Sequence, residues 1–148
     1  MGIIRCGSGS SSKYAPEKTP FVGSGSSSAY PGSTEVKPTN FLQTYPDYTP
    51  FDNGGKYRIV KGGTYRFLLK GYQYNESGRR YNVTLYVYNE DGTVVDSLSV
   101  TYLGVDLNWH STTKDITVSD NAYIDIGFIR TSGGTSDAVS AQVEINPV

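Results

Sequence analysis

The chain offers few side chains that could act as catalysts. Its 148 residues include a single histidine, His110, and a single cysteine, Cys6. A Ser-His-Asp triad would have to use His110, and a cysteine nucleophile would have to be Cys6, which lies in a Gly-rich stretch with no base fixed near it. Carboxylate pairs for glycoside hydrolysis would come from aspartates that mostly occupy predicted turns or solvent-facing strand positions: Asp91, Asp96, Asp106, Asp115, Asp120 and Asp125. We therefore expect no catalytic residue and no enzyme.

Metal-binding patterns are equally sparse. One cysteine excludes an internal disulfide and a cysteine-based metal cage, and one histidine excludes a histidine-rich metal site. The stretch NEDG at 89–92 could hold calcium, but it lacks EF-hand spacing and is more typical of a turn. We expect no metal and no cofactor.

Tyrosines provide the better candidates for binding. Sugar sites on β-sandwiches stack aromatic rings on a pyranose, with amides and hydroxyls nearby to bind its hydroxyl groups. One face of the stretch 81–88 offers such groups, and a loop tryptophan could join them, with Tyr72 and Tyr74 as further aromatics: Asn82, Thr84, Tyr86, Tyr88 and Trp109. The same tyrosines could instead be covered by the N-terminal segment or by a neighbouring subunit, because tyrosine is favoured in strands and in interfaces. The set is a candidate protein interface or glycan platform.

The elements that would position these residues are predicted to be strands. In 81–88, Tyr81, Val83, Leu85 and Val87 alternate with polar or aromatic residues, and no window has a helical period. Further strands are predicted at 56–61, 64–70, 93–103, 115–118, 122–130 and 138–145. Gly62-Gly63 suggests a tight hairpin connection, and 89–93 suggests another turn. This pattern predicts an all-β fold, an antiparallel two-sheet sandwich of the jelly-roll type.

The first 52 residues are predicted to form an extended N-terminal arm, followed by a sandwich domain at 53–148. The stretch GSGSSSKYAP at 7–16 returns as GSGSSSAYPG at 23–32, and hydrophobic periodicity is absent. Gly and Ser alone would indicate a flexible linker. The interspersed Tyr14, Phe21 and Tyr30 favour an arm that becomes ordered against a partner or a sister copy. Deleting residues 1–50 is then expected to leave a folded body that no longer assembles.

Charge is unevenly distributed, although the net charge is only −1. Residues 56–80 hold seven basic residues and one acidic residue, whereas 81–148 hold two basic and nine acidic residues. These segments could neutralise each other within one body, or a basic and an acidic face could meet between subunits, with Arg79 and Arg80 as the candidate charged interface. The acidic segment 81–148 argues against a nucleic-acid partner.

The succession Tyr57-x-Ile59, KGGTYxF at 61–67, VxLxVxNxDG at 83–92 and AYIxIxF at 122–128 resembles carbohydrate-binding-module sandwiches. Such modules recur in bacteriophage tail, fibre and head-decoration proteins and in secreted glycosidases. No apolar run is long enough for a signal peptide or a membrane span, which favours a protein made in the host cytoplasm and located in the virion.

The resemblance implies a non-enzymatic phage capsid decoration subunit anchored by its arm. The alternative is a glycan-binding module of a tail or fibre that recognises the host surface. The expected partners are other virion proteins and sister copies in a homo-oligomer, with a cell-surface glycan as a further possibility, and neither nucleic acid nor membrane.

Overall fold

The computed structural model describes residues 23–38, 42–43, 50–51, 56–74, 78–134 and 137–148. Within these ranges the chain forms strands and connecting turns. There is no helix in them, and hence none that is long and apolar enough to cross a membrane. The strands are β1 (Gly23–Ala29), β2 (Leu42–Gln43), β3 (Pro50–Phe51), β4 (Lys56–Ile59), β5 (Gly63–Gln73), β6 (Arg80–Tyr88), β7 (Val94–Leu103), β8 (His110–Val118), β9 (Ala122–Ser132) and β10 (Val139–Pro147).

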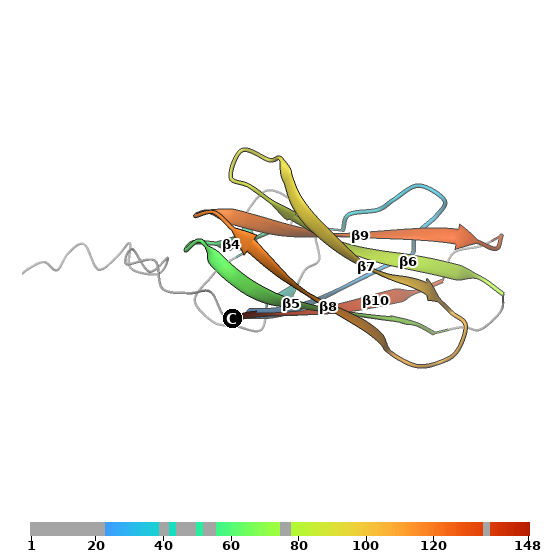
Figure 1. Ribbon diagram of the computed structural model, residues 1–148. Coiled ribbons are helices and arrows are strands. Elements are labelled where there is room, and N and C mark those ends of the chain that lie inside the picture. The colour runs from blue at the N-terminus through green and yellow to red at the C-terminus, as the bar shows by residue number, and fades with distance from the viewer. Residues whose placement is uncertain (1–22, 39–41, 44–49, 52–55, 75–77, 135–136) are drawn as a thin grey trace, which may run out of the picture.

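Two antiparallel sheets lie face to face (Figure 1). Sheet A has the order β2-β1-β10-β5-β8, and sheet B has the order β3-β4-β9-β6-β7. Consecutive strands therefore often belong to different sheets, and the chain crosses between layers repeatedly. This arrangement confirms the predicted all-β, two-sheet jelly-roll sandwich.

The core lies between the sheets and is built from alternate residues of each strand. In β6, the inward residues Tyr81, Val83, Leu85 and Val87 are fully buried, as the alternation predicted. Sheet A supplies the opposing layer from the inward positions of β5 and β10: Tyr65, Phe67, Leu69, Val139, Ala141, Val143 and Ile145. Because side chains alternate along a strand, the residues between these positions must face outward.

The connection at Gly62-Gly63 differs from the expected hairpin. β4 pairs with β9 in sheet B, whereas β5 pairs with β10 and β8 in sheet A. The two glycines therefore lie at a crossing between layers. A Cβ on Gly62 would lie 2.8 Å from the carbonyl oxygen of Val118 and 2.9 Å from the amide nitrogen of Asp120, so glycine is required by a close approach of backbones.

The turn at 89–93 is confirmed as a hairpin between β6 and β7. The amide of Asn89 donates to the Thr93 carbonyl, and Gly92 has a φ of 91°. Asp91 Oδ1 accepts hydrogen bonds from both the amide and the hydroxyl of Thr93, which is the behaviour of a turn aspartate.

The second copy of the Gly/Ser repeat is a strand of the sandwich, and the predicted boundary at residue 53 lies too late in the chain for this segment. All seven residues of β1 pair with β10, from Gly23 opposite Ile145 to Ala29 opposite Val139. Gly23, Gly25 and Ser27 face inward and are buried. A strand whose inward residues are glycine and serine carries no hydrophobic period, which is why the sequence pattern did not reveal it. Residues 1–22 of the predicted arm, with Tyr14 and Phe21, lie outside the described residues.

This placement changes the expected effect of N-terminal truncation. Deleting residues 1–22 should preserve the fold, because it leaves β1 and its pairing with β10 intact. Deleting residues 1–38 should lower the free energy of unfolding by several kcal/mol, because all seven residues of β1 pair with β10 and each lost main-chain hydrogen bond contributes roughly 1 kcal/mol net. Urea denaturation of the two truncated chains beside the full chain measures the difference. Equal stability of both truncations would show that β1 contributes nothing to the sandwich.

Candidate functional site

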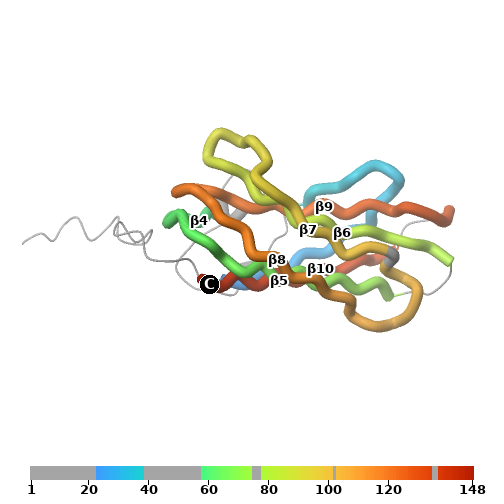
Figure 2. The backbone as a smooth tube through the Cα atoms, viewed as in Figure 1, coloured from blue at the N-terminus to red at the C-terminus, as the bar shows by residue number. Residues whose placement is uncertain are grey.

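The outward face of β6 holds the predicted platform residues, and a segment of the chain covers part of it. After β1, residues 31–37, here called the strap, leave sheet A and run beside β9 at sheet B (Figure 2). Val36 exchanges two backbone hydrogen bonds of 2.8 Å with Phe128, and the amide of Arg130 donates to the Gly32 carbonyl at 2.8 Å. The strap therefore prolongs sheet B beyond the short strand β4.

Two side chains of the strap bind the two platform tyrosines. The Tyr86 hydroxyl donates a 2.5 Å hydrogen bond to Glu35 Oε2, and Lys37 Nζ donates to the Tyr88 hydroxyl at 3.0 Å. The Lys37 ammonium also lies 4.5 Å from the Tyr86 ring centroid, a cation–π contact. Tyr88 stacks on Tyr123 with ring centroids 5.0 Å apart and is itself buried. Lys37 thus lies over one face of the Tyr86 ring, and Tyr88 is packed within the protein's own chain.

Burial and the strap both act on the ionisation of Tyr86. Desolvation, followed by the hydrogen bond to the Glu35 carboxylate, raises the pKa of Tyr86 to about 12. Gly127 of β9 makes room for this bond, since a Cβ there would lie 2.5 Å from Glu35 Cδ and Oε2. A glycine opposite Thr84 and next to Tyr86 is therefore what allows the carboxylate to reach across β9.

The remaining platform residues do not join the tyrosines in one site. Thr84 exchanges a 2.8 Å hydrogen bond with Ser99 of the neighbouring strand, and Asn82 is partly buried on the same face. Trp109 lies just before β8, an edge strand of sheet A, on the other layer of the sandwich. The predicted set therefore divides between two sheets.

Trp109 instead belongs to an aromatic cluster with Tyr72 and Tyr74. The rings of Tyr72 and Trp109 are tilted with centroids 5.2 Å apart, and those of Tyr72 and Tyr74 meet edge to face at 4.7 Å. Trp109 is 44% exposed and Tyr74 is 57% exposed. These three aromatics, which the sequence suggested only as additions to the β6 platform, form an open cluster of their own.

The cluster adjoins shallow hollows on the outward face of sheet A. One hollow of about 310 Å³ is lined by Ser26 and Ser28 of β1, by Ser140 and Gln142 of β10, and by Tyr74 and Trp109. A second of about 410 Å³ is lined by Lys70, Trp109, Ser111 and Gln142. We refer to the aromatic cluster and these polar residues together as the sheet A surface. Sequence reasoning missed the polar members because their assembly depends on the pairing of β1, β10, β5 and β8.

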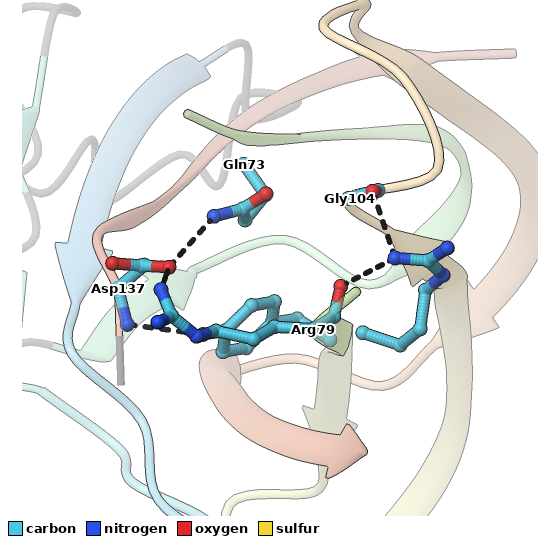
Figure 3. Close-up of polar contacts among 6 residues, drawn as sticks. Gln73, Arg79, Gly104 and Asp137 are labelled. Atoms are coloured by element: carbon cyan, nitrogen blue, oxygen red, sulfur yellow. Dashed lines mark hydrogen bonds and ion pairs between the residues drawn. The ribbon is translucent and has the colours of Figure 1, made fainter. Parts of the chain in front are cut away.

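Arg79 and Arg80 are engaged within the chain, and Figure 3 shows Arg79 directed at Asp137. The Arg79 guanidinium forms an ion pair with Asp137, whose carboxylate also accepts a 3.5 Å hydrogen bond from Gln73. Arg80 Nη1 donates to the carbonyls of Arg79 and Gly104 at 2.8 and 2.9 Å. Both side chains are partly buried, and their contacts hold together loops at one end of the sandwich.

Arg66, another basic residue of 56–80, also pairs with an acid from the last third of the chain. Arg66 forms two hydrogen bonds of 2.8 and 2.9 Å with Asp115, and these bonds hold the pKa of that carboxyl below its usual range. β5 and β8 are neighbours, with Arg66 directly opposite Asp115. These pairs favour charge neutralisation within one body over a charged contact between subunits.

The structure also places two other residues that the sequence singled out, His110 and Tyr30. His110 is the first residue of β8, and its Nε2 lies 2.7 Å from Oδ1 of Asp106 in the preceding loop. Tyr30, at the start of the segment after β1, is 74% exposed. Among the described residues there is no group of three or more His, Cys, Asp or Glu side chains that could hold a metal ion.

Comparisons with known proteins relate the chain to others through its fold. No family model matches it, and no curated protein matches its sequence. The globular domain of zebrafish complement 1qA aligns with a TM-score of 0.59 and 12% identity over 88% of this chain and 98% of that one. The infectious bursal disease virus VP2 subviral particle protein aligns with a TM-score of 0.57 and 12% identity over 86% of this chain and 33% of that one.

The resemblance to carbohydrate-binding modules holds only as a general likeness of sandwiches. The module CBM6cm-2 from Cellvibrio mixtus lichenase 5A, solved with cellotriose, gives a TM-score of 0.40 and 13% identity over 81% of this chain and 90% of that one. An alignment this loose supports no argument about a site. The chain is thus a jelly-roll sandwich whose function must be argued from its own surfaces.

The strap makes a specific prediction about Tyr86. Difference absorbance titration against Tyr86→Phe should find the Tyr86 pKa near 12, above the ordinary value of about 10. Since the folded pKa is raised, the bond's contribution to stability should be complete below about pH 10 and lost as pH rises towards 12. Glu35→Gln and Gly127→Ala should both lower the pKa of Tyr86. Gly134→Ala, where an added Cβ meets nothing within 4 Å, should leave it unchanged. An unshifted pKa in Gly127→Ala would mean that Glu35 does not control this hydroxyl.

Proposed function

We propose that the protein is a non-enzymatic structural subunit of a virus particle, an accessory subunit of a phage capsid that self-associates through the sheet A surface. The observation on which this rests is the open aromatic cluster of Tyr72, Tyr74 and Trp109. Exposed aromatics gathered in one place, beside further exposed apolar side chains, are typical of protein interfaces. Val105 and Leu107, in the loop that leads to Trp109, are exposed as well.

The charge of the sheet A surface suits a second copy of the same chain. Serine and glutamine form most of its polar part, and Lys70 and Glu144 both line a hollow of about 210 Å³ on it. A surface with one cation and one anion does not repel its own copy, and a symmetric contact can place the lysine of one subunit near the glutamate of the other. The face of β6 is less suitable, because the strap covers its tyrosines.

Two considerations support the virion as the location. A protein of a viral subviral particle has the same fold, although the likeness extends to fold alone. The Gly/Ser arm with Tyr14 and Phe21 is suited to lie extended on a foreign surface and to place aromatic rings in its pockets. In this proposal residues 1–22 attach the subunit to the particle, and the sandwich provides contacts between subunits.

Self-association should depend on the aromatic cluster. Tyr74→Ser combined with Trp109→Ser should convert an oligomer into a monomer at micromolar concentration, because buried aromatic anchors contribute roughly 1–3 kcal/mol each to association. Sedimentation velocity measures the change, and thermal melting checks that the variant remains folded. Val94→Ser, which alters another residue that is 57% exposed, is the matched control and should stay oligomeric. A monomeric wild-type protein would contradict the proposed contact.

The virion role is tested on particles themselves. Particles produced from a genome lacking this gene should lose a surface feature in electron cryomicroscopy, and added full-length protein should restore it. The chain lacking residues 1–22 should fold but fail to restore it. If purified wild-type particles contain none of the protein, the structural assignment is wrong even where self-association is observed.

Glycan binding at the same surface is the second candidate, because the hollows beside Trp109 combine an exposed ring with hydroxyl and amide groups. A glycan array with the wild-type chain should then show binding to a defined oligosaccharide, lost in both Trp109→Ala and Gln142→Ala. Self-association alone predicts background signal on the array and little effect of Gln142→Ala. Array binding by a protein that sediments as a monomer would favour the glycan-binding function.

A further inference from the structure

The repeated Gly/Ser segment has a match to the structure that goes beyond composition. Residues 7–14 read GSGSSSKY and residues 23–30 read GSGSSSAY, so the two copies differ only at Lys13 and Ala29. The second copy is β1 followed by Tyr30. The first copy therefore has the same residue as the second at every position except Lys13, and its sequence suits the place of β1 equally well at all the others.

The requirement is set by the place that β1 occupies beside β10. The inward positions Gly23, Gly25 and Ser27 are buried and lie opposite Ile145, Val143 and Ala141, so small residues fill this place in the structure. Outward positions carry serines that line the sheet A surface. The first copy presents Gly7, Gly9 and Ser11 in the same order. When the first copy is aligned with the second, these residues take the inward positions and its serines at 8, 10 and 12 take the outward ones.

We propose that the edge of β10 is a binding site for either copy of the repeat, and that residues 7–13 can replace β1 there within the same chain. The register of residues along β10 would be retained, with Ser12 opposite Ser140 in place of Ser28. In this second state the segment 15–30 becomes a loop, and only residues 1–6 precede the first strand. The exchange thus shortens the segment that precedes the first strand of the sandwich from residues 1–22 to residues 1–6.

Three features explain why the second copy holds the site in the structure. Ala29 packs on the core opposite Val139, whereas Lys13 would bring an ammonium group to that position. Pro31, which follows, is buried. β1 leads directly into the strap, whose Val36 amide donates to Phe128. The residues after the first copy cannot replace the strap, because the residue equivalent to Val36 is Pro20, which has no N–H to donate, so in the exchanged state the strap must bind from the end of a loop. The second copy is favoured, and the first copy is the less populated alternative.

The consequence for assembly rests on the proposed function, but the exchange itself does not. If residues 1–22 attach the subunit to a particle, pairing of residues 7–13 with β10 withdraws part of that attachment and releases a loop containing Phe21 and Tyr30. The free subunit and the attached subunit would then differ in which copy is paired. The strap could remain on sheet B in both states, since the released loop supplies the slack.

Cross-strand disulfides can report which copy is paired. In a Cys6→Ser background, Ser28→Cys with Ser140→Cys traps the observed register, and Ser12→Cys with Ser140→Cys traps the exchanged one, because directly opposite residues lie within disulfide reach. Ser8→Cys with Ser140→Cys is the matched control, since Ser8 would lie opposite Glu144 in the exchanged state. Mass spectrometry of the oxidised full chain measures the yields.

We expect the Ser12 pair to form an intrachain disulfide in clear excess over the Ser8 control, and more slowly than the Ser28 pair. Ala29→Lys should raise the yield of the Ser12 pair and lower that of the Ser28 pair, and Lys13→Ala should act in the same direction. A Ser12 yield no higher than the control overturns the exchange. Disulfide-linked dimers in place of intrachain bonds, increasing with concentration, would assign the first copy to a second chain and overturn the intrachain form. None of these results depends on particle attachment.

Discussion

The structure depends on one constraint, the burial of a single apolar layer between two sheets whose strands alternate their side chains. β6 shows it most directly, because every second residue from Tyr81 to Val87 is fully buried. Once these residues face inward, the intervening ones must face outward, and the same applies to β5 and β10 in the other sheet. The positions of both tyrosine groups, at β6 and beside Trp109, follow from this division.

The constraint also determines what covers each outward face. On sheet B, the strap adds backbone pairing to the part of β9 that the short strand β4 leaves uncovered, and its Glu35 and Lys37 bind the tyrosine hydroxyls. On sheet A, the comparable face carries serines, Gln142 and an open aromatic cluster. The two outward faces of the sandwich thus differ in how far the chain itself covers them.

Much of the fold was predictable because its strands have strong periodicity. The alternation in 81–88 and 138–145 identifies both the strands and their buried faces, and the turn at 89–93 has the expected chemistry. The partners of each strand were not predictable: Gly62-Gly63 permits a hairpin as well as a crossing, and local residues do not show that β4 and β5 pair with different neighbours. β1 escaped notice because its inward residues are glycine and serine, which give no hydrophobic signal.

The candidate site, too, could be predicted only in part from the sequence. Tyr72, Tyr74 and Trp109 were visible as exposed aromatics, but their grouping apart from Tyr86 and Tyr88 depends on which sheet each strand joins. The contact of Glu35 with Tyr86 joins residues 51 positions apart and requires a glycine at 127 on the strand between them. Such contacts arise from tertiary pairing, for which a single sequence contains no local pattern. The sequence also shows that basic residues gather in 56–80 and acidic residues in 81–148. That Arg66 pairs with Asp115 could be seen only from the register of β5 and β8.

The position of the strap directly after β1 couples the two faces of the molecule. β1 lines the sheet A surface through its serines, and the next residues bind sheet B over Tyr86. Only four residues lie between Tyr30 and Glu35, so a movement of β1 along β10 would pull on the strap unless additional chain is available. In the proposed exchange the repeat upstream supplies such chain, because its run of small residues takes the place of β1 while residues 15–30 form the slack. The upstream copy is then more than a spacer, because its sequence matches that of β1 at every position except Lys13.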